Sequence, residues 1–269
     1  MHAPTERRPQ PAAAGAGAAQ RRPRLPRWRG LPRAIAFLTI APMPAAARDG
    51  LAGATGWFPL LGAAIGALAG SVRVGTEPLL GRGPATVLAL ITLVAVTGAL
   101  HQDGLADTAD GLGARGDRPG RLAVMRDPST GVFGALALIG WASLMLTTLA
   151  SLNAAHASIA LTVACALARW AALLHAASAR PARSEGLGAA LHVSRPALGA
   201  ATVVAATLTL GLCAVIPGAV SIGTALIVAA LTSLLANRSL GGRTGDTLGA
   251  TIAVTEVVVC VALLAAWRG

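Results

Sequence analysis

Eight apolar runs separated by short polar connections account for most of this chain of 269 residues. A helix needs about 20 apolar residues to cross a bilayer, with about 17 as the lower limit, and seven of the runs reach that length. Only Arg169 and Glu256 place a charge inside any run. The pattern predicts an all-α, polytopic integral membrane protein with about seven transmembrane helices. The runs are 34–47, 52–72, 84–100, 129–150, 156–177, 198–216, 219–236 and 248–267.

The first run differs from the others because it is only fourteen residues long and contains Pro42 and Pro44. A run of that length is too short to cross the hydrocarbon core, so we expect a re-entrant or interfacial segment here. Charged residues make up 12% of the chain, roughly half of the about 25% that is typical of soluble domains. Composition and run length together argue against a soluble, alanine-rich helical protein.

Arginine placement predicts which side of the membrane each connection occupies. The net charge of +11 comes from arginine without lysine, and eight of the 22 arginines lie in residues 1–33. Basic segments beside spans stay cytoplasmic and attract anionic lipid, so we expect membrane lipid as a partner and no nucleic acid. Residues 1–33 should form a disordered, basic Pro/Ala-rich tail, and 34–269 a single transmembrane domain. Seven spans then put connections 101–128, 178–197 and 237–247 on the cytoplasmic side.

The acid stretch, residues 100–111, reads Leu-His-Gln-Asp-Gly-Leu-Ala-Asp-Thr-Ala-Asp-Gly and holds three of the eleven acidic residues. Asp103, Asp107 and Asp110 have the spacing i, i+4, i+7, which puts them on one face of a helix. Like charges aligned in this way repel each other, and clustered carboxylate oxygens are ligands that Mg²⁺ and Ca²⁺ prefer. The stretch therefore predicts a divalent-cation site at the membrane surface, with His101 as an adjacent candidate for catalysis.

Further polar motifs fall in the same three connections. Acids and arginines at one membrane face suit a phosphorylated substrate, because carboxylates hold a cation that bridges phosphate oxygens while guanidinium groups bind the rest. The added candidates are Arg126, Asp127, Arg183, Glu185, Arg243 and Thr244 for the substrate and Asp246 for the metal. Asp127 has a second interpretation as the N-terminal cap of the span that follows it. Glu256 either extends the site or pairs with Arg169 inside the membrane.

Six short motifs in this order resemble the cobalamin (5′-phosphate) synthase family, also called adenosylcobinamide-GDP ribazoletransferases. The resemblance covers about residues 34–260 and is most specific in the acid stretch. The motifs are Phe37–Pro44, Phe58–Gly66, Asp103–Gly111, Met125–Gly134, Arg183–Gly188 and Gly242–Ala250.

The resemblance implies a Mg²⁺-dependent enzyme of the bacterial inner membrane, with 34–269 as its catalytic domain and an active site facing the cytoplasm. It implies transfer of the adenosylcobinamide phosphate moiety from adenosylcobinamide-GDP to α-ribazole or its 5′-phosphate. GMP is released in this late step of nucleotide-loop assembly in cobalamin biosynthesis. The metal ligands would be Asp103, Asp107, Asp110 and Asp246, and Asp110 or His101 would take the proton of the nucleophile.

Two other functions share some of these features. CDP-alcohol phosphatidyltransferases also begin an acid motif with Asp-Gly, but they need Ala-Arg soon afterwards, and here Ala106 is followed by Asp107. Cation-coupled transporters commonly place acids at mid-membrane and contain internal repeats, whereas these acids gather at one face and no repeat is visible. The oligomeric state stays open, a homo-oligomer included.

Overall fold

The computed structural model describes residues 30–45, 50–51 and 53–268. Over these residues the chain is α-helical without a strand, and six helices are long and apolar enough to cross a membrane. Counting α4 and α5 as one bent span gives a seventh crossing. This confirms the predicted fold class. The six are α3 (Phe58–Leu80), α7 (Val132–Ala150), α8 (Ala154–Ser178), α10 (Arg195–Cys213), α11 (Val215–Leu235) and α12 (Gly245–Arg268).

Shorter elements connect the long helices. Helix α1 has nine residues, too few to cross a bilayer, which agrees with the interfacial segment predicted for the first apolar run. The predicted disordered tail lies outside the described residues up to position 29, and α1 already begins at Gly30. The short elements are α1 (Gly30–Leu38), η2 (Thr55–Trp57), α4 (Arg82–Thr97), α5 (Leu100–Gly113), α6 (Arg118–Val124), α9 (Leu187–Ala190) and the π-helical turn η3 (Ala236–Leu240).

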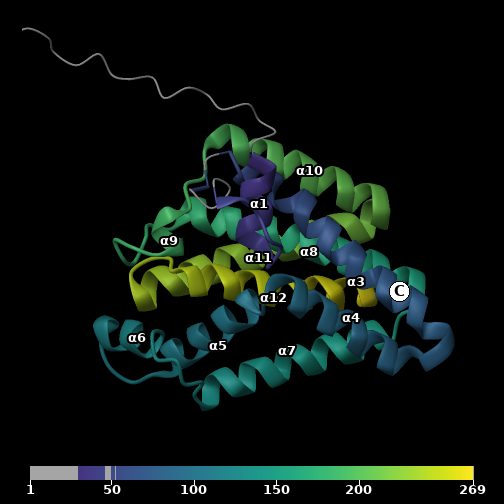
Figure 1. Ribbon diagram of the computed structural model, residues 1–269, viewed down its shortest axis with the longest axis horizontal. Helices are drawn as coiled ribbons and strands as arrows, with labels where there is room; N and C mark the ends of the chain where they lie inside the picture. Colours follow the sequence, from purple (N-terminus) through teal and green to yellow (C-terminus); the bar gives the residue numbers. More distant parts are fainter. Residues whose placement is uncertain (1–29, 46–49, 52, 269) are drawn as a thin grey trace, which may run out of the picture.

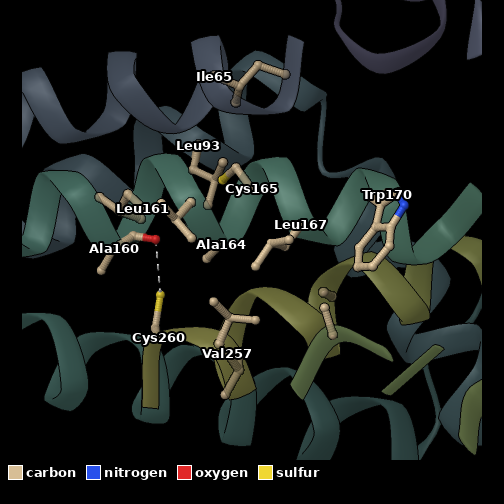
Figure 2. Packing of buried hydrophobic residues seen from close by; sticks show 14 of the residues in the cluster. Ile65, Leu93, Ala160, Leu161, Ala164, Cys165, Leu167, Trp170, Val257 and Cys260 are labelled. Atoms are coloured by element: carbon tan, nitrogen blue, oxygen red, sulfur yellow. Dashed lines mark hydrogen bonds between the residues drawn. The ribbon is translucent and has the colours of Figure 1, made fainter. Parts of the chain in front are cut away.

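Helix α12 lies inside the bundle, packed against α8, α5, α11 and α7. Figure 1 shows the long helices running roughly along the long axis of the molecule, with α6 and α9 at one end and the C-terminus at the other. In Figure 2, α8 lies between α3 and α12, and the Cys260 thiol of α12 donates toward the Ala160 carbonyl of α8 at 3.9 Å. The core is therefore a layered stack with α8 in its middle.

Three glycines let α3 approach α8 closely. Gly62, Gly66 and Gly70 recur every four residues and share one helix face, and a Cβ atom at any of them would lie 2.3 Å from an atom of α8. At Gly62 and Gly66 that atom is a backbone carbonyl oxygen. Between membrane helices, small residues at this spacing allow backbone contact, which replaces the hydrophobic driving force that lipid does not provide.

Replacing Gly66 by alanine is expected to destabilise the protein by about 1–3 kcal/mol, because the added methyl group forces α3 away from Leu161 of α8. Thermal unfolding of the purified protein in detergent measures the effect. Gly75→Ala is the matched control on the same helix, since a Cβ there has no atom within 4 Å. Equal melting temperatures for the two variants would contradict the packing argument.

Candidate functional site

The acid stretch forms α5, and a sharp bend in the chain sets the direction of this helix relative to α4. Helices α4 and α5 meet at 87°, and the chain turns through Gly98 and Ala99, with φ of 61° and 58°. The left-handed conformation favours glycine at position 98, where a Cβ atom would also lie 2.4 Å from the Ile40 side chain. For Ala99 the left-handed conformation costs about 1 kcal/mol, which the surrounding packing must offset.

A second close approach brings α5 against the start of α12. A Cβ atom at Gly104 would lie 2.7 Å from the Asp246 carbonyl oxygen and 3.2 Å from the Gly249 Cα. Asp246 therefore lies beside α5, where its charge acts on Asp103 and Asp107. We call Asp103, Asp107 and Asp246 the acid cluster. It unites three of the four predicted metal ligands from two helices.

Arg183 brings a positive charge to the acid cluster. Its Nη1 lies 3.9 Å from Asp246 Oδ2, and its Nη2 donates to the Leu122 carbonyl at 2.9 Å. Burial and the neighbouring charge of Arg126 lower the pKa of Arg183. Arg126 and Glu185 are both exposed. The connection that contains Arg126 and the connection that contains Arg183 therefore meet at the end of the bundle that carries the acid cluster.

Asp110 takes a different position from the other acids of α5. Its Oδ2 accepts from the Gly131 N–H at 2.7 Å, and its Oδ1 accepts from the Gly134 N–H at 2.9 Å. These groups belong to the first turn of α7, whose unpaired N–H groups attract a carboxylate. Both carboxylate oxygens are thereby engaged, and the contact fixes α7 relative to α5. The predicted metal role of Asp110 competes with this one.

The N-terminal cap interpretation of Asp127 is wrong. Helix α7 begins at Val132, and Asp110 satisfies its first turn. The exposed Asp127 instead accepts a hydrogen bond from the Ser129 N–H at 2.8 Å, which lowers the pKa of its carboxyl group. Sequence reasoning missed the true cap because it lies more than twenty residues away in the chain.

Arg243 and Thr244 organise the backbone around the acid cluster. The buried Arg243 guanidinium donates to three backbone carbonyls: Gly188 at 3.0 Å, Leu191 at 3.0 Å, and Ala179. All three of its nitrogens are therefore engaged within the protein, unlike those of a free phosphate-binding arginine. Thr244 and Thr247 exchange hydrogen bonds at the start of α12, in the manner of a capping box. Thr244 Oγ1 also donates to Asp246 Oδ2 at 3.3 Å.

Inside the bundle, Glu256 of α12 forms an ion pair with Arg169 of α8, and both side chains are fully buried. Of the two interpretations of Glu256, the structure therefore supports pairing with Arg169 inside the membrane. Arg169 Nη2 also lies 3.4 Å from His101 Nδ1. The pair thus connects to the first turn of α5, two residues before Asp103.

The acid cluster is chemically suited to a hard divalent cation, because its donor atoms are carboxylate oxygens. Asp103 is exposed, so the cluster is open to solvent on one side. Within the described part of the chain, no three His, Cys, Asp or Glu side chains converge tightly enough to hold an ion as they stand. Mg²⁺ therefore stays a prediction. Its binding requires side-chain movement of the acids.

Comparison with known proteins gives a consistent result. The family described as Cobalamin-5-phosphate synthase matches residues 30–264. A relative from Sinorhizobium medicae (strain WSM419) is 38% identical over 256 residues, which cover 88% of this chain and 96% of that protein. Relatives from Klebsiella pneumoniae (strain 342) and Escherichia coli (strain K12 / DH10B) are 36% identical, covering 86% of this chain and 97% of their own length. All three are named adenosylcobinamide-GDP ribazoletransferase. No solved structure matches.

Proposed function

This chain belongs to the cobalamin-5-phosphate synthase family, and from that premise we propose that it transfers the adenosylcobinamide phosphate moiety of adenosylcobinamide-GDP to α-ribazole or its 5′-phosphate, releasing GMP. The observation that carries the proposal is the acid cluster with Arg183 beside it. Carboxylates and a guanidinium group at one end of a membrane bundle suit a substrate that carries a pyrophosphate. The family match argues against both alternative functions, the CDP-alcohol phosphatidyltransferase and the cation-coupled transporter.

We further propose that Asp103, Asp107 and Asp246 hold a Mg²⁺ ion. When bound, the ion would neutralise pyrophosphate charge and stabilise the leaving GMP. Asp110 is the weakest of the predicted ligands, because both of its oxygens already accept hydrogen bonds from α7. The chemistry of the donor set supports this assignment.

In the reaction, a ribose hydroxyl of the acceptor forms a bond to the phosphorus that carries the cobinamide, and the bond from that phosphorus to the GMP oxygen breaks. In this proposal Arg183 binds the phosphate oxygens, while the Leu122 carbonyl holds one of its guanidinium nitrogens. The hydroxyl proton leaves to a carboxylate of the acid cluster. The two predicted proton acceptors, Asp110 and His101, are already engaged with α7 and Arg169.

The multi-pass architecture supports an assignment to the bacterial inner membrane. The arginine-rich connections lie with the acid cluster, so the rule that positive charge stays inside puts the active site at the cytoplasmic face. Water-soluble nucleotide substrates would approach from that side, and membrane lipid would surround the apolar helix faces. A homo-oligomer is compatible with this arrangement and is not required by it.

A GMP-release assay on the purified protein in detergent tests the proposal. We expect GMP only when adenosylcobinamide-GDP and α-ribazole are both present. Excess chelator should lower the rate by at least about a hundredfold, and added Mg²⁺ should restore it. Full turnover in chelator would refute the metal assignment, whereas folded protein that releases no GMP with either acceptor would refute the transfer itself.

A further inference from the structure

Helices α5 and α12 cross where the backbone of one lies directly on the backbone of the other. Gly104 of α5 and Gly249 of α12 face each other at this crossing. A Cβ atom at Gly249 would lie 3.4 Å from the Gly104 Cα and 3.5 Å from the His101 Cα. Interdigitating side chains normally fix the rotation of one helix against another. Two facing glycines supply no such side chain, so contacts elsewhere must fix how α5 is turned about its own axis.

The rotation of α5 decides where its acids lie. Asp103 comes two residues after His101, and a helix turns by about 100° per residue, so the two side chains point to nearly opposite faces of α5. Asp103 is exposed and His101 is buried, as this spacing requires. Asp107 follows Asp103 by one helical turn and shares its face. A turn of α5 about its axis would therefore change the position of both acids relative to Asp246.

The two ends of α5 are held in different ways. Near the C-terminal end, Asp110 is bound to the first turn of α7. At the N-terminal end, the chain enters through Gly98 and Ala99, both in a left-handed conformation, so helical continuity with α4 does not set the rotation of α5. The N-terminal half of α5, which carries Asp103, therefore depends on a further contact.

His101 supplies that contact on the buried side of α5. It is 2% exposed, and its Nδ1 lies 3.4 Å from Nη2 of Arg169. Arg169 can only donate, so Nδ1 accepts. The other ring nitrogen, Nε2, has no hydrogen-bond partner among the described residues. Within the part of the chain that the structure describes, Arg169 is therefore the polar anchor of this side chain.

Arg169 is itself held by three helices. Its Nη1 forms the ion pair with Glu256 of α12 and lies 3.4 Å from the Cys165 carbonyl oxygen of α8. The Cys165 thiol donates to the same Glu256 oxygen at 3.6 Å. A Cβ atom at Gly62 of α3 would lie 2.9 Å from the Arg169 Cδ, so the stem of the side chain lies against the α3 backbone. The guanidinium is therefore a fixed point in the core, to which His101 ties α5.

We propose that His101 and Arg169 are positioning residues, which hold α5 in the rotation that places Asp103 and Asp107 beside Asp246. The inference rests on the proposed function and adds two residues that prepare the metal site without contacting the ion or a substrate. Residues that orient metal ligands in this way usually matter for metal affinity. This role takes the place of the proton-acceptor role predicted for His101.

Binding of Mn²⁺ alone tests the inference, because the oxygen ligands that suit Mg²⁺ also suit Mn²⁺. The electron paramagnetic resonance signal of unbound Mn²⁺ gives the dissociation constant of the full chain in detergent, without either substrate. His101→Leu removes the acceptor for Arg169, and we expect the dissociation constant to rise by about tenfold or more. His101→Asn can offer its amide oxygen in place of Nδ1 and should restore most of the affinity. Equal dissociation constants for the wild-type protein and His101→Leu would overturn the inference.

A variant on the other side of the contact keeps the test decisive if His101→Leu does not fold. Arg169→Met combined with Glu256→Leu removes the donor to His101, and it removes both charges of the buried pair together, so it should fold. Its dissociation constant for Mn²⁺ should rise as in His101→Leu. Wild-type affinity in this double variant would contradict the positioning role.

Glu77→Gln is the matched control, because Glu77 pairs with another fully buried arginine, Arg73 of α3. That arginine also donates to Thr86 of α4 at 2.9 Å, so the pair joins α3 to α4 and leaves α5 and α12 untouched. The control should unfold at a lower temperature but bind Mn²⁺ with wild-type affinity. A loss of affinity equal to that of His101→Leu would trace the effect to general stability and overturn the inference.

Hydrogen exchange of the metal-free protein separates this inference from the metal assignment. Backbone amides exchange faster where a segment loses the contacts that hold it, so His101→Leu should exchange faster than the wild-type protein in α5 and in the first turn of α12, with α10 unchanged. Wild-type protein that binds no Mn²⁺ would refute the metal assignment, and faster exchange confined to α5 and α12 would still support positioning. Unchanged exchange in α5 would overturn the inference.

Discussion

Replacing Asp107 by asparagine is expected to lower the rate of GMP release by at least about a hundredfold. The asparagine side chain would keep the size of the aspartate but remove a charge that faces Asp103, Asp110 and Asp246. Because those like charges repel one another in the metal-free protein, the same change should leave its melting temperature equal or higher. A fall in activity without a fall in stability is what distinguishes a functional carboxylate from a structural one. GMP release and thermal unfolding in detergent measure the two effects.

Asp117→Asn is the matched control for this variant. Asp117 caps α6 by accepting from the Gly120 N–H at 3.0 Å, and asparagine caps helices as well as aspartate does. The control therefore removes one acid from the same connection without touching the acid cluster, and its activity should equal that of the wild-type protein. Asp107→Asn with normal turnover would exclude Asp107 from the metal site, and equal losses in both variants would indicate a general charge effect.

The membrane architecture could be predicted from the sequence because it depends on local composition. Each long apolar run contains a helix in the structure, since a backbone in lipid must satisfy its own hydrogen bonds. The 87° turn after α4 could not be predicted in the same way. It depends on Ala99 in a left-handed conformation, which alanine does not favour by itself. Contact between distant parts of the chain holds it there.

The sequence could predict that acids and arginines gather at one end of the bundle, but not which contacts each of them makes. The spacing of Asp103, Asp107 and Asp110 does place them on one helix, yet Asp110 turns to the first turn of α7 while the other two stay beside Asp246. Likewise, nothing in the short motif around Arg243 indicates that three distant carbonyls take its donors. Hydrogen bonds between residues far apart in the chain decide these roles, and single-sequence patterns carry no information about them.

Glu256→Ala is expected to destabilise the protein by about 3–5 kcal/mol, the usual cost of removing one partner of a buried ion pair. The Arg169 guanidinium would remain fully buried between α8 and α12 without its counter-charge, and lipid offers no replacement. Thermal unfolding in detergent and the amount of folded protein in membranes measure the loss. Glu185→Ala, which removes an exposed glutamate, should unfold at the wild-type temperature.

A double variant, Arg169→Met with Glu256→Leu, decides what the pair contributes. Apolar residues of similar volume often replace a buried ion pair without loss of stability, so the double variant should be much more stable than Glu256→Ala. It also removes the group that donates to His101, so GMP release is measured alongside stability. Recovered stability with undiminished GMP release would show that the pair serves packing alone.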